Sequence, residues 1–281
     1  MTSSLSFARH GPPTPSSPLV LAVPHAGRDY PQALQSAIRL PLAALKGLED
    51  RCADALALEA WRGETLFVAH RARAWIDLNR GEQERDPKLD DGAGMLGVPL
   101  SAKLRSGLGL VPRRIGNAGD IWSRRLSAAE VTARIAEDHR PYHAALAEAL
   151  QAARDRFGVA VLVDIHSMPP LAAANEPPRL VIGDRFGKSA DARFVSRIEE
   201  TARALHVPAV NNVPYAGGHT LERHGNPRGG IHAVQLEFDR SFYLDPQLDR
   251  PGPGFAAAVR LLRAVLDALL DEALPGALAA E

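Results

Sequence analysis

The amino-acid sequence predicts an α/β fold: a single three-layer domain whose central sheet is mostly parallel or mixed and has helices on both faces. Short apolar runs rich in β-branched residues indicate the sheet, because residues 19–23 and 159–165 have the composition of strands buried on both faces. Segments with the apolar periodicity of helices separate such runs, so strands and helices alternate along the chain. This alternation is typical of a sheet covered on both sides.

The same patterns give the expected order of the elements. Strands are expected at residues 19–23, 65–69, 74–78, 158–166, 180–183, 207–211 and 231–238. Helices are expected at residues 45–61, 128–156, 189–206 and 255–270.

Local signals refine the middle of the chain. Ser127 and Glu130 have the spacing of a capping box, which predicts that a helix begins there. Pro141 is expected to kink that helix or to make it restart, because proline donates no backbone hydrogen bond. Residues 81–120 carry many Gly and Pro residues with weak periodicity, so they are expected to form long loops over one edge of the sheet.

Composition argues against several classes of partner. The chain has 281 residues with 33 basic and 33 acidic side chains, so its formal charge gives no reason to expect nucleic acid or an anionic membrane. Aromatic residues make up only 5% and offer no platform on which bases could stack. No apolar stretch approaches the roughly 20 residues of a membrane span.

The number of cysteines indicates the cellular compartment, and the composition of the first residues indicates where the folded domain begins. The single cysteine, Cys52, excludes an intrachain disulfide and fits a reducing compartment, so a cytoplasmic location is expected. Residues 1–18 are rich in Ser and Pro and are expected to form a flexible arm. Residues 19–281 are then expected to form the domain, and both a monomer and a homo-oligomer are compatible with this sequence.

Two histidines follow buried strands and point to a metal site. His25 comes directly after the run 19–24, and His166 ends the run that begins at residue 158. Parallel strands bring their carboxyl ends to one edge of a sheet, where α/β proteins place their chemistry. Zinc accepts neutral imidazole nitrogens and needs one more protein ligand plus a water molecule. A lone histidine in such a place is more often structural, but the pair favours a zinc site.

Polar residues at other expected strand ends suit substrate binding. Asn79 and Arg80 follow the expected strand 74–78 and offer an amide beside a planar guanidinium, which suits a carboxylate. A surface salt bridge is the alternative interpretation of Arg80. Residues 211–220 form a glycine-rich loop with Tyr215, Gly217 and Gly218, as expected of a flap over a site.

Glu237 is the candidate general base. Alternation in residues 231–240 puts Val234, Leu236 and Phe238 on one face of a strand and Glu237 on the other, beside Gln235. A glutamate inside an otherwise apolar strand costs several kcal/mol unless it is paired or lies near a metal. Its carboxylate suits proton transfer from a water molecule that a metal activates.

Taken together, these motifs resemble the N-formylglutamate amidohydrolases, which are similar to zinc carboxypeptidases and aspartoacylases. The resemblance extends over roughly residues 19–245 and rests on six short motifs in the family's order. These motifs are residues 24–27, 50–54, 77–80, 164–167, 183–187 and 215–245.

The resemblance implies a phosphorylase/hydrolase-like sheet and a zinc-dependent amidohydrolase with one zinc per chain. His25 and His166 would be zinc ligands, Asn79 and Arg80 would bind the substrate carboxylate, and Glu237 would be the catalytic acid and base. The substrate would be a small carboxylated N-formyl or other N-acyl amino acid, such as N-formyl-L-glutamate. The alternatives are a hydrolase of a different N-acyl amino acid or small peptide, and a non-catalytic relative that binds a carboxylate.

The chain departs from the carboxypeptidase pattern at one position. Those relatives take a metal ligand from a glutamate three residues after the first histidine, where this chain has Arg28. The missing carboxylate has three candidates: Asp54, Asp50 and Asp29. We favour Asp54, with Asp50 next as a ligand or as a partner of one, because both lie one turn apart on an expected helix. A solvated helix face is the alternative for both.

Overall fold

The computed structural model describes residues 6–95, 101–171 and 176–274, so the first residues of the expected arm and the last of the expected domain lie outside it. The chain folds into two compact units. Unit 1 consists of Met1–Ala8, Pro24–Glu49 and Ala69–Ala145. Unit 2 consists of Arg9–Val23, Asp50–Val68 and Leu146–Glu281. The division into an arm and one domain stays a prediction.

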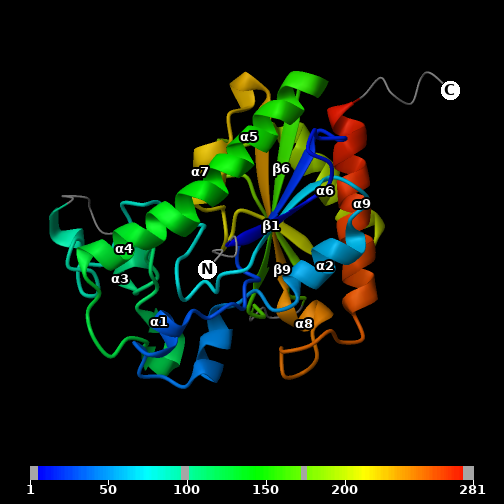
Figure 1. The fold of residues 1–281 in the computed structure, drawn as a ribbon. Coiled ribbons are helices and arrows are strands. Elements are labelled where there is room, and N and C mark those ends of the chain that lie inside the picture. Colours follow the sequence, from blue (N-terminus) through cyan, green and yellow to red (C-terminus); the bar gives the residue numbers. More distant parts are fainter. Residues whose placement is uncertain (1–5, 96–100, 172–175, 275–281) are drawn as a thin grey trace. The chain divides into compact units, whose positions relative to one another are not determined.

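A mixed seven-stranded sheet (Figure 1) confirms the predicted α/β class, and all of it except Phe7, Ala8 and Ala69 belongs to unit 2. Its strand order is β1-β3-β2-β6-β9-β7-β8. The strands are β1 Phe7–His10, β2 Leu19–Val23, β3 Thr65–Ala69, β6 Ala160–Met168, β7 Leu180–Gly183, β8 Ala209–Asn211 and β9 Ile231–Asp239. Strands β3, β2, β6 and β9 are parallel neighbours, and β7 runs antiparallel to β9. Strand β1, within the stretch assigned to the arm, is not predicted by the sequence.

The register of the sheet brings chemically active residues together. On β6 and β9, Asp164 lies opposite Gln235 and His166 lies opposite Glu237. On β2, Ala22 pairs with Asp164, so the carboxyl end of β2 reaches the same level of the sheet. Every residue of β2 and β6 is buried, as expected for strands covered on both faces.

Helices supply those two covering layers. They are α2 Ala53–Ala60, α6 Ala192–Ala204, α7 His219–His224, α8 Arg240–Tyr243 and α9 Phe255–Ala273, with the 3-10 turn η5 Pro227–Gly229. Helix α9 buries an apolar stripe that includes Leu262, Leu266 and Leu269 and packs against α2 and α6. Figure 1 shows α9 and α2 on one side of the strands and α5 Arg140–Phe157 on the other.

Unit 1 is built mainly from loops and short elements. These are α1 Gln32–Gln35, η1 Leu42–Leu48, η2 Ala93–Met95, α3 Ala102–Arg105, β4 Arg114–Ile115, η3 Gly116–Ala118, β5 Gly119–Asp120, α4 Ala128–Arg134 and η4 Ile135–His139, followed by the start of α5 Arg140–Phe157. The long loops expected at residues 81–120 are confirmed for their described part, where only short elements occur.

The helical path from residue 128 to 157 shows both predicted signals. The side chain of Ser127 accepts from the amide of Glu130, and the Glu130 carboxylate accepts from the amide of Ser127, so the capping box is present. The five residues before Arg140 form a π-helical turn that joins α4 to α5. Pro141 donates no hydrogen bond, and the wider turn just before it accommodates the interrupted ladder.

The strand expected at residues 74–78 is wrong. Ala74, Ile76 and Leu78 are buried as alternation predicts, but the segment consists of turns without strand pairing. Its backbone bonds are local or reach a loop: the amide of Trp75 donates to Ala72 O, and the amide of Asp77 donates to Leu110 O. The alternation of apolar residues correctly indicates which positions are buried, but no neighbouring strand forms a hydrogen-bond ladder with this segment.

The single helix expected at residues 45–61 is also wrong. The 3-10 helix η1 ends at Leu48, and α2 begins only at Ala53. Between them Cys52 adopts a left-handed backbone conformation with φ of 58°, which a continuing helix does not allow. Asp50 therefore precedes α2 and does not share a helix face with Asp54.

Within the described residues, no helix combines the length and the apolar character needed to cross a bilayer.

Candidate active site

His25, in unit 1, is held by a buried aspartate. It lies two residues after the end of β2 and is only 3% exposed. Its Nε2 lies 2.7 Å from Oδ1 of Asp77. A carboxylate can only accept, so Nε2 carries the proton, and in the neutral ring Nδ1 is left with the lone pair. The turn that follows needs glycine, because a Cβ on Gly27 would lie 2.0 Å from the carbonyl oxygen of Arg71.

Hydrogen-bond donors from several residues hold the Asp77 carboxylate in place. Besides His25, its Oδ1 accepts from the amide of Asn79 at 2.9 Å, and its Oδ2 accepts from Nε of Arg73 at 2.8 Å. Burial alone would raise the pKa of Asp77, but the positive charge of Arg73, the hydrogen-bonded His25 ring and the positive charge of Arg80 outweigh it and hold that pKa well below its usual value. Asp77 is therefore an anion that orients the His25 ring.

Asn79 and Arg80 lie in the turn after Asp77, and both are buried. The guanidinium of Arg80 donates through Nε to Leu108 O at 2.9 Å and through Nη1 to Asn79 O at 2.6 Å. In the part of the chain that the structure describes, its Nη2 donates to no other residue. The turn thus presents one fixed amino group of a guanidinium beside an amide side chain.

Asp29, the third candidate for an acidic ligand, forms an ion pair with Arg71. Arg71 also lies 3.5 Å from Asp138. The Asp29 side chain is exposed, so this pair is a surface feature of unit 1.

His166, in unit 2, lies between two carboxylates. Its Nε2 is 2.9 Å from Oδ2 of Asp164, and its Nδ1 is 3.1 Å from Oδ2 of Asp50. Burial favours the neutral ring, but the negative charges of Asp164, Asp50 and Glu237 outweigh it and raise the pKa of His166 well above its usual value. A cation bound there would replace the proton on Nδ1, so that the Nδ1 lone pair and the Asp50 carboxylate could serve as a nitrogen and an oxygen ligand.

Asp50 is anchored by an arginine from the end of β9. Arg240 donates through Nη2 to Oδ1 of Asp50 at 3.2 Å and through Nε to Oγ of Ser167 at 3.0 Å. Asp50 is 1% exposed, whereas Asp54 is half-buried in the first turn of α2. The structure thus places Asp50, the second choice from the sequence, against His166. Arg240 is not among the residues predicted from the sequence, although its place after a strand end is a usable signal.

Glu237 lies beside His166 in the sheet. The two residues are opposed in the register of β6 and β9, and Glu237 is 7% exposed. Its Oε1 accepts from Nε2 of Gln235 at 2.9 Å, which places both side chains on the same face of β9. This agrees with the predicted alternation, because Val234 and Leu236 on the other face are fully buried.

The glycine-rich loop lies between β8 and α7. Gly217 has a φ of 108°, and a Cβ there would lie 2.5 Å from a methyl carbon of Leu221, so the backbone at this point requires glycine. Tyr215 and Gly218 are half-buried, and Arg223 and Arg228 are exposed. The role of Tyr215, Gly217 and Gly218 in binding substrate stays a prediction.

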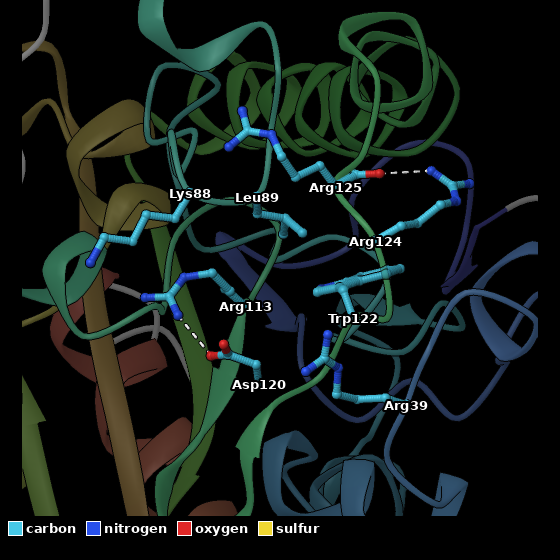
Figure 2. A pocket seen from close by; sticks show the side chains of 8 residues that line it. All are labelled: Arg39, Lys88, Leu89, Arg113, Asp120, Trp122, Arg124 and Arg125. Carbon is cyan, nitrogen blue, oxygen red and sulfur yellow. Dashed lines mark hydrogen bonds and ion pairs between the residues drawn. The ribbon is translucent and has the colours of Figure 1, made fainter.

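A separate cavity of about 240 Å³ in unit 1 is lined mainly by basic residues (Figure 2). Its lining residues are Arg39, Lys88, Leu89, Arg113, Asp120, Trp122, Arg124 and Arg125. Three of the arginines are neutralised: Arg113 by Asp86 and Asp120, Arg124 by Glu130 and Arg125 by Asp91. In Figure 2 the guanidinium groups of Arg124 and Arg125 point away from one another. These ion pairs stabilise the loops, and no residue predicted for the site lines this cavity.

Comparison with known proteins extends over nearly the whole chain. A family model described as N-formylglutamate amidohydrolase matches residues 17–244. An N-formylglutamate deformylase of Pseudomonas aeruginosa is 27% identical over 263 residues, which is 92% of each chain. A protein of the same name from Pseudomonas putida is 27% identical over 81% of this chain and 82% of its own. The crystal structure of an N-formylglutamate amidohydrolase from Ralstonia eutropha JMP134 has a TM-score of 0.86 at 31% identity, over 96% of this chain and 98% of its own.

The charge of Asp77 should contribute stability that acid removes. With chelator present, Asp77→Asn is expected to lower the free energy of unfolding by about 3 kcal/mol at pH 7, because it leaves buried cations without their partner. The pKa of Asp77 is lower in the folded than in the unfolded protein, so its charge stabilises the fold at pH values above the unfolded pKa of about 3.9. This contribution is lost as the pH falls through the folded pKa. The difference from wild type, measured by urea unfolding, should therefore shrink below about pH 4.

Asp29→Asn is the matched control, because it removes an exposed carboxylate from an arginine pair in the same unit. Its effect should stay below about 1 kcal/mol at pH 7. If the free energy of unfolding of Asp77→Asn differs from that of wild type by the same amount at pH 3 and at pH 7, the carboxylate charge is not the source of the difference.

Proposed function

The chain belongs to the N-formylglutamate amidohydrolase family, and on this basis we propose that it hydrolyses the amide bond of an N-formyl or other N-acyl amino acid, with N-formyl-L-glutamate as the first candidate. One structural observation carries the proposal beyond the family assignment. Each of the two histidines that the sequence singled out has its Nε2 against a buried aspartate: Asp77 behind His25, and Asp164 behind His166. Metal-binding histidines almost always have such a partner on the nitrogen that does not bind the metal.

We propose one zinc ion per chain, held by His25, His166 and Asp50. The donors are two imidazole Nδ1 atoms and one carboxylate, a set that suits a catalytic zinc site with an open position. Strand order supports the pairing of the histidines, because His25 follows β2 by two residues and His166 lies on the adjacent parallel strand β6. When bound, zinc would supply Lewis acidity that polarises an amide carbonyl and makes water a stronger acid.

We propose Asp50 as the acidic ligand in place of Asp54. Its support is the 3.1 Å between its carboxylate and Nδ1 of His166. Arg240 holds the other carboxylate oxygen of Asp50 and would fix its orientation. The left-handed backbone at Cys52 is the reason that Asp50 precedes α2.

Glu237 is proposed as the acid and base of the reaction. It would accept a proton from the attacking water and return it to the leaving amine, so that the acyl group leaves as a carboxylic acid such as formic acid. Its place opposite His166 supports this role, as does Gln235, which holds one oxygen of the carboxylate. This position also favours an enzyme over a non-catalytic relative, since keeping a glutamate buried costs several kcal/mol and would bring a non-catalytic protein no benefit.

Asn79 and Arg80 are proposed to bind the carboxylate of the substrate. Arg80 has an amino group directed to no described residue, and a charge-assisted contact to a carboxylate is commonly worth about 1.5–3 kcal/mol. Tyr215, Gly217 and Gly218 would cover the substrate from the loop before α7. The substrate is thus a small carboxylated amide.

The activity itself is tested with a panel of N-acyl amino acids. Zinc-loaded protein is expected to hydrolyse N-formyl-L-glutamate with a higher kcat/KM than N-acetyl-L-glutamate or N-formyl-L-alanine, measured by release of the free amino acid. A chelator should abolish turnover, and added zinc should restore it. Zinc-loaded protein that hydrolyses none of these amides would contradict the proposed function, and a preference for another acyl group would change the substrate.

Metal content separates the two candidate aspartates. Asp50→Asn is expected to lower zinc content and to weaken zinc affinity by at least about tenfold, because an amide oxygen is a poorer ligand than a carboxylate. Asp54→Asn, the matched control four residues further along the chain, should keep about one zinc per chain by elemental analysis. The reverse pattern would return the ligand role to Asp54. Loss of zinc in neither variant would rule out both.

The role of Glu237 is tested by Glu237→Gln, which keeps the shape of the side chain but cannot accept the proton. Zinc content should be unchanged, and kcat should fall by roughly 10² to 10⁴, the usual contribution of a general base. Glu64→Gln is the control, since Glu64 is also a buried glutamate of unit 2 and pairs with Arg263. It should lower stability with little change in kcat. Near wild-type turnover in Glu237→Gln would show that Glu237 is structural.

A further inference from the structure

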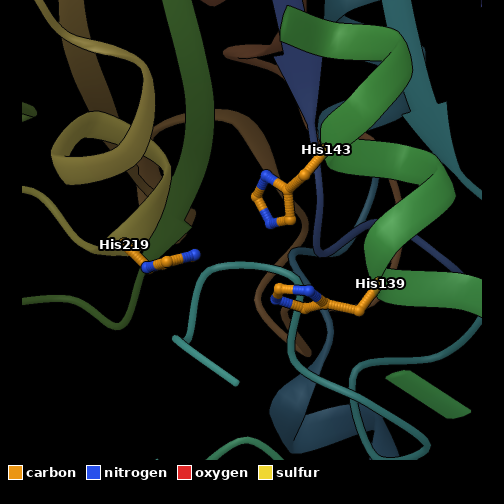
Figure 3. Close-up of side chains that lie close together, drawn as sticks. All are labelled: His139, His143 and His219. Atoms are coloured by element: carbon orange, nitrogen blue, oxygen red, sulfur yellow. The ribbon is translucent and has the colours of Figure 1, made fainter. Parts of the chain in front are cut away.

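Two buried histidines of unit 1 lie outside the proposed metal site. His139 and His143 are four residues apart at the junction of the π-helical turn with α5. Both side chains are fully buried, and their ring centroids are 4.4 Å apart. Figure 3 shows the two imidazoles on the same side of their helix. Neither histidine is predicted from the sequence as a site residue, because neither follows a strand.

Each histidine contacts a backbone carbonyl in the turn that carries Asn79 and Arg80. Nε2 of His143 lies 2.8 Å from Leu78 O, and Nε2 of His139 lies 2.8 Å from Arg80 O. A carbonyl oxygen can only accept, so both rings carry their proton on Nε2 and donate it. On its other side, Nδ1 of His139 lies 3.9 Å from a carboxylate oxygen of Glu82.

These contacts give three successive carbonyls of the turn a side-chain donor. Leu78 O accepts from His143, Asn79 O accepts from Nη1 of Arg80, and Arg80 O accepts from His139. The segment is not a strand, so no ladder would satisfy these buried oxygens. Without the histidines, two buried carbonyls would lose their partners, and the turn would relax toward other conformations.

Two residues of the preceding helical turn contact Trp75, which lies at the start of the segment that leads to Asn79 and Arg80. Nη1 of Arg134 donates to Trp75 O at 3.0 Å, and Asp138 accepts from the indole of Trp75 at 2.7 Å. Arg134, Asp138, His139 and His143 thus form one row of side chains along the segment. A π-helical turn lies within this row, and such turns are frequent at functional sites.

We propose that His139 and His143 are positioning residues for recognition of the substrate carboxylate. They fix the backbone of the turn, so that Nη2 of Arg80 and the amide of Asn79 keep one orientation toward the carboxylate. This inference rests on the proposed function for its substrate, but the rigidity of the turn is a property of the chain alone. Neither histidine touches the reacting atoms.

The test compares His143→Leu, which removes the donor, with His143→Gln, whose Nε2 reaches the same place. In the zinc-loaded protein, His143→Leu is expected to raise KM for N-formyl-L-glutamate about tenfold with a smaller change in kcat. It should also reduce the preference for the free acid over its α-amide. Arg80→Ala, which removes the guanidinium that is proposed to bind the carboxylate, is the reference variant and should lose that preference. His143→Gln should stay within about threefold of wild type, and His139→Leu and His139→Gln should behave as the matching pair.

His232→Leu is the matched control. His232 is another buried histidine that contacts the backbone, through the amide of Asp191, and it lies in unit 2. Its loss should lower stability without changing KM or the preference for the acid. Should His143→Leu not fold, His143→Asn takes its place, because its shorter amide cannot reach Leu78 O.

Hydrogen exchange of the peptide backbone at residues 76–81, followed by mass spectrometry, separates this inference from the proposed function. Exchange should be faster in His143→Leu and His139→Leu than in wild type and in the glutamine variants. This readout needs no substrate, so it decides on positioning even if wild type hydrolyses no N-acyl amino acid. Unchanged exchange, or a folded His143→Leu protein with wild-type KM and wild-type acid preference, would overturn the inference.

Discussion

Ionised groups buried in this protein need compensating charge, and the site residues of both units are arranged around that constraint. An isolated carboxylate taken out of water is so costly that it takes up a proton instead. Asp77 stays charged because Arg73, Arg80 and His25 surround it, and the charge in turn fixes the tautomer of His25. The charges are reversed at His166, where carboxylates surround a buried imidazole and raise its pKa. Such a carboxylate-rich setting around an imidazole is one that a divalent cation would neutralise.

The sheet of unit 2 fixes the positions of His166 and Glu237 relative to one another. His166 and Glu237 are opposed because β6 and β9 pair in parallel over their full lengths, and a slip by one residue would move one of them to the other face. All residues of β6 and nearly all of β9 are buried, so packing specifies the register strongly. The distance between the proposed ligand and the proposed base therefore depends on the whole core and not on a loop.

Sequence could predict what is encoded locally. The runs that form β2, β6 and β9 have the composition or alternation of buried strands, so His25, His166 and Glu237 could be singled out as candidates from the sequence. The Ser127 capping box is equally local.

What the sequence missed depends on contacts between distant segments. Residues 74–78 alternate like a strand but have no strand to pair with, and Asp50 lies against His166 because Cys52 breaks the expected helix. The role of Arg240 depends on its contact with Asp50, which lies 190 residues away along the chain.

The irregular backbone of residues 74–78 also explains how the turn at Asn79 and Arg80 can be held. In a strand, the carbonyls of this segment would be used by the ladder, and its side chains would alternate between two faces. In a turn the carbonyls are free to accept from side chains, so successive residues can be oriented independently. Arg80 uses this freedom by donating to the carbonyl of its own neighbour while another amino group stays available. The cost is a set of buried carbonyls that require donors, and His139 and His143 meet that requirement for two of them. An irregular backbone is thus stable here because a helix supplies the hydrogen bonds that a neighbouring strand would otherwise give.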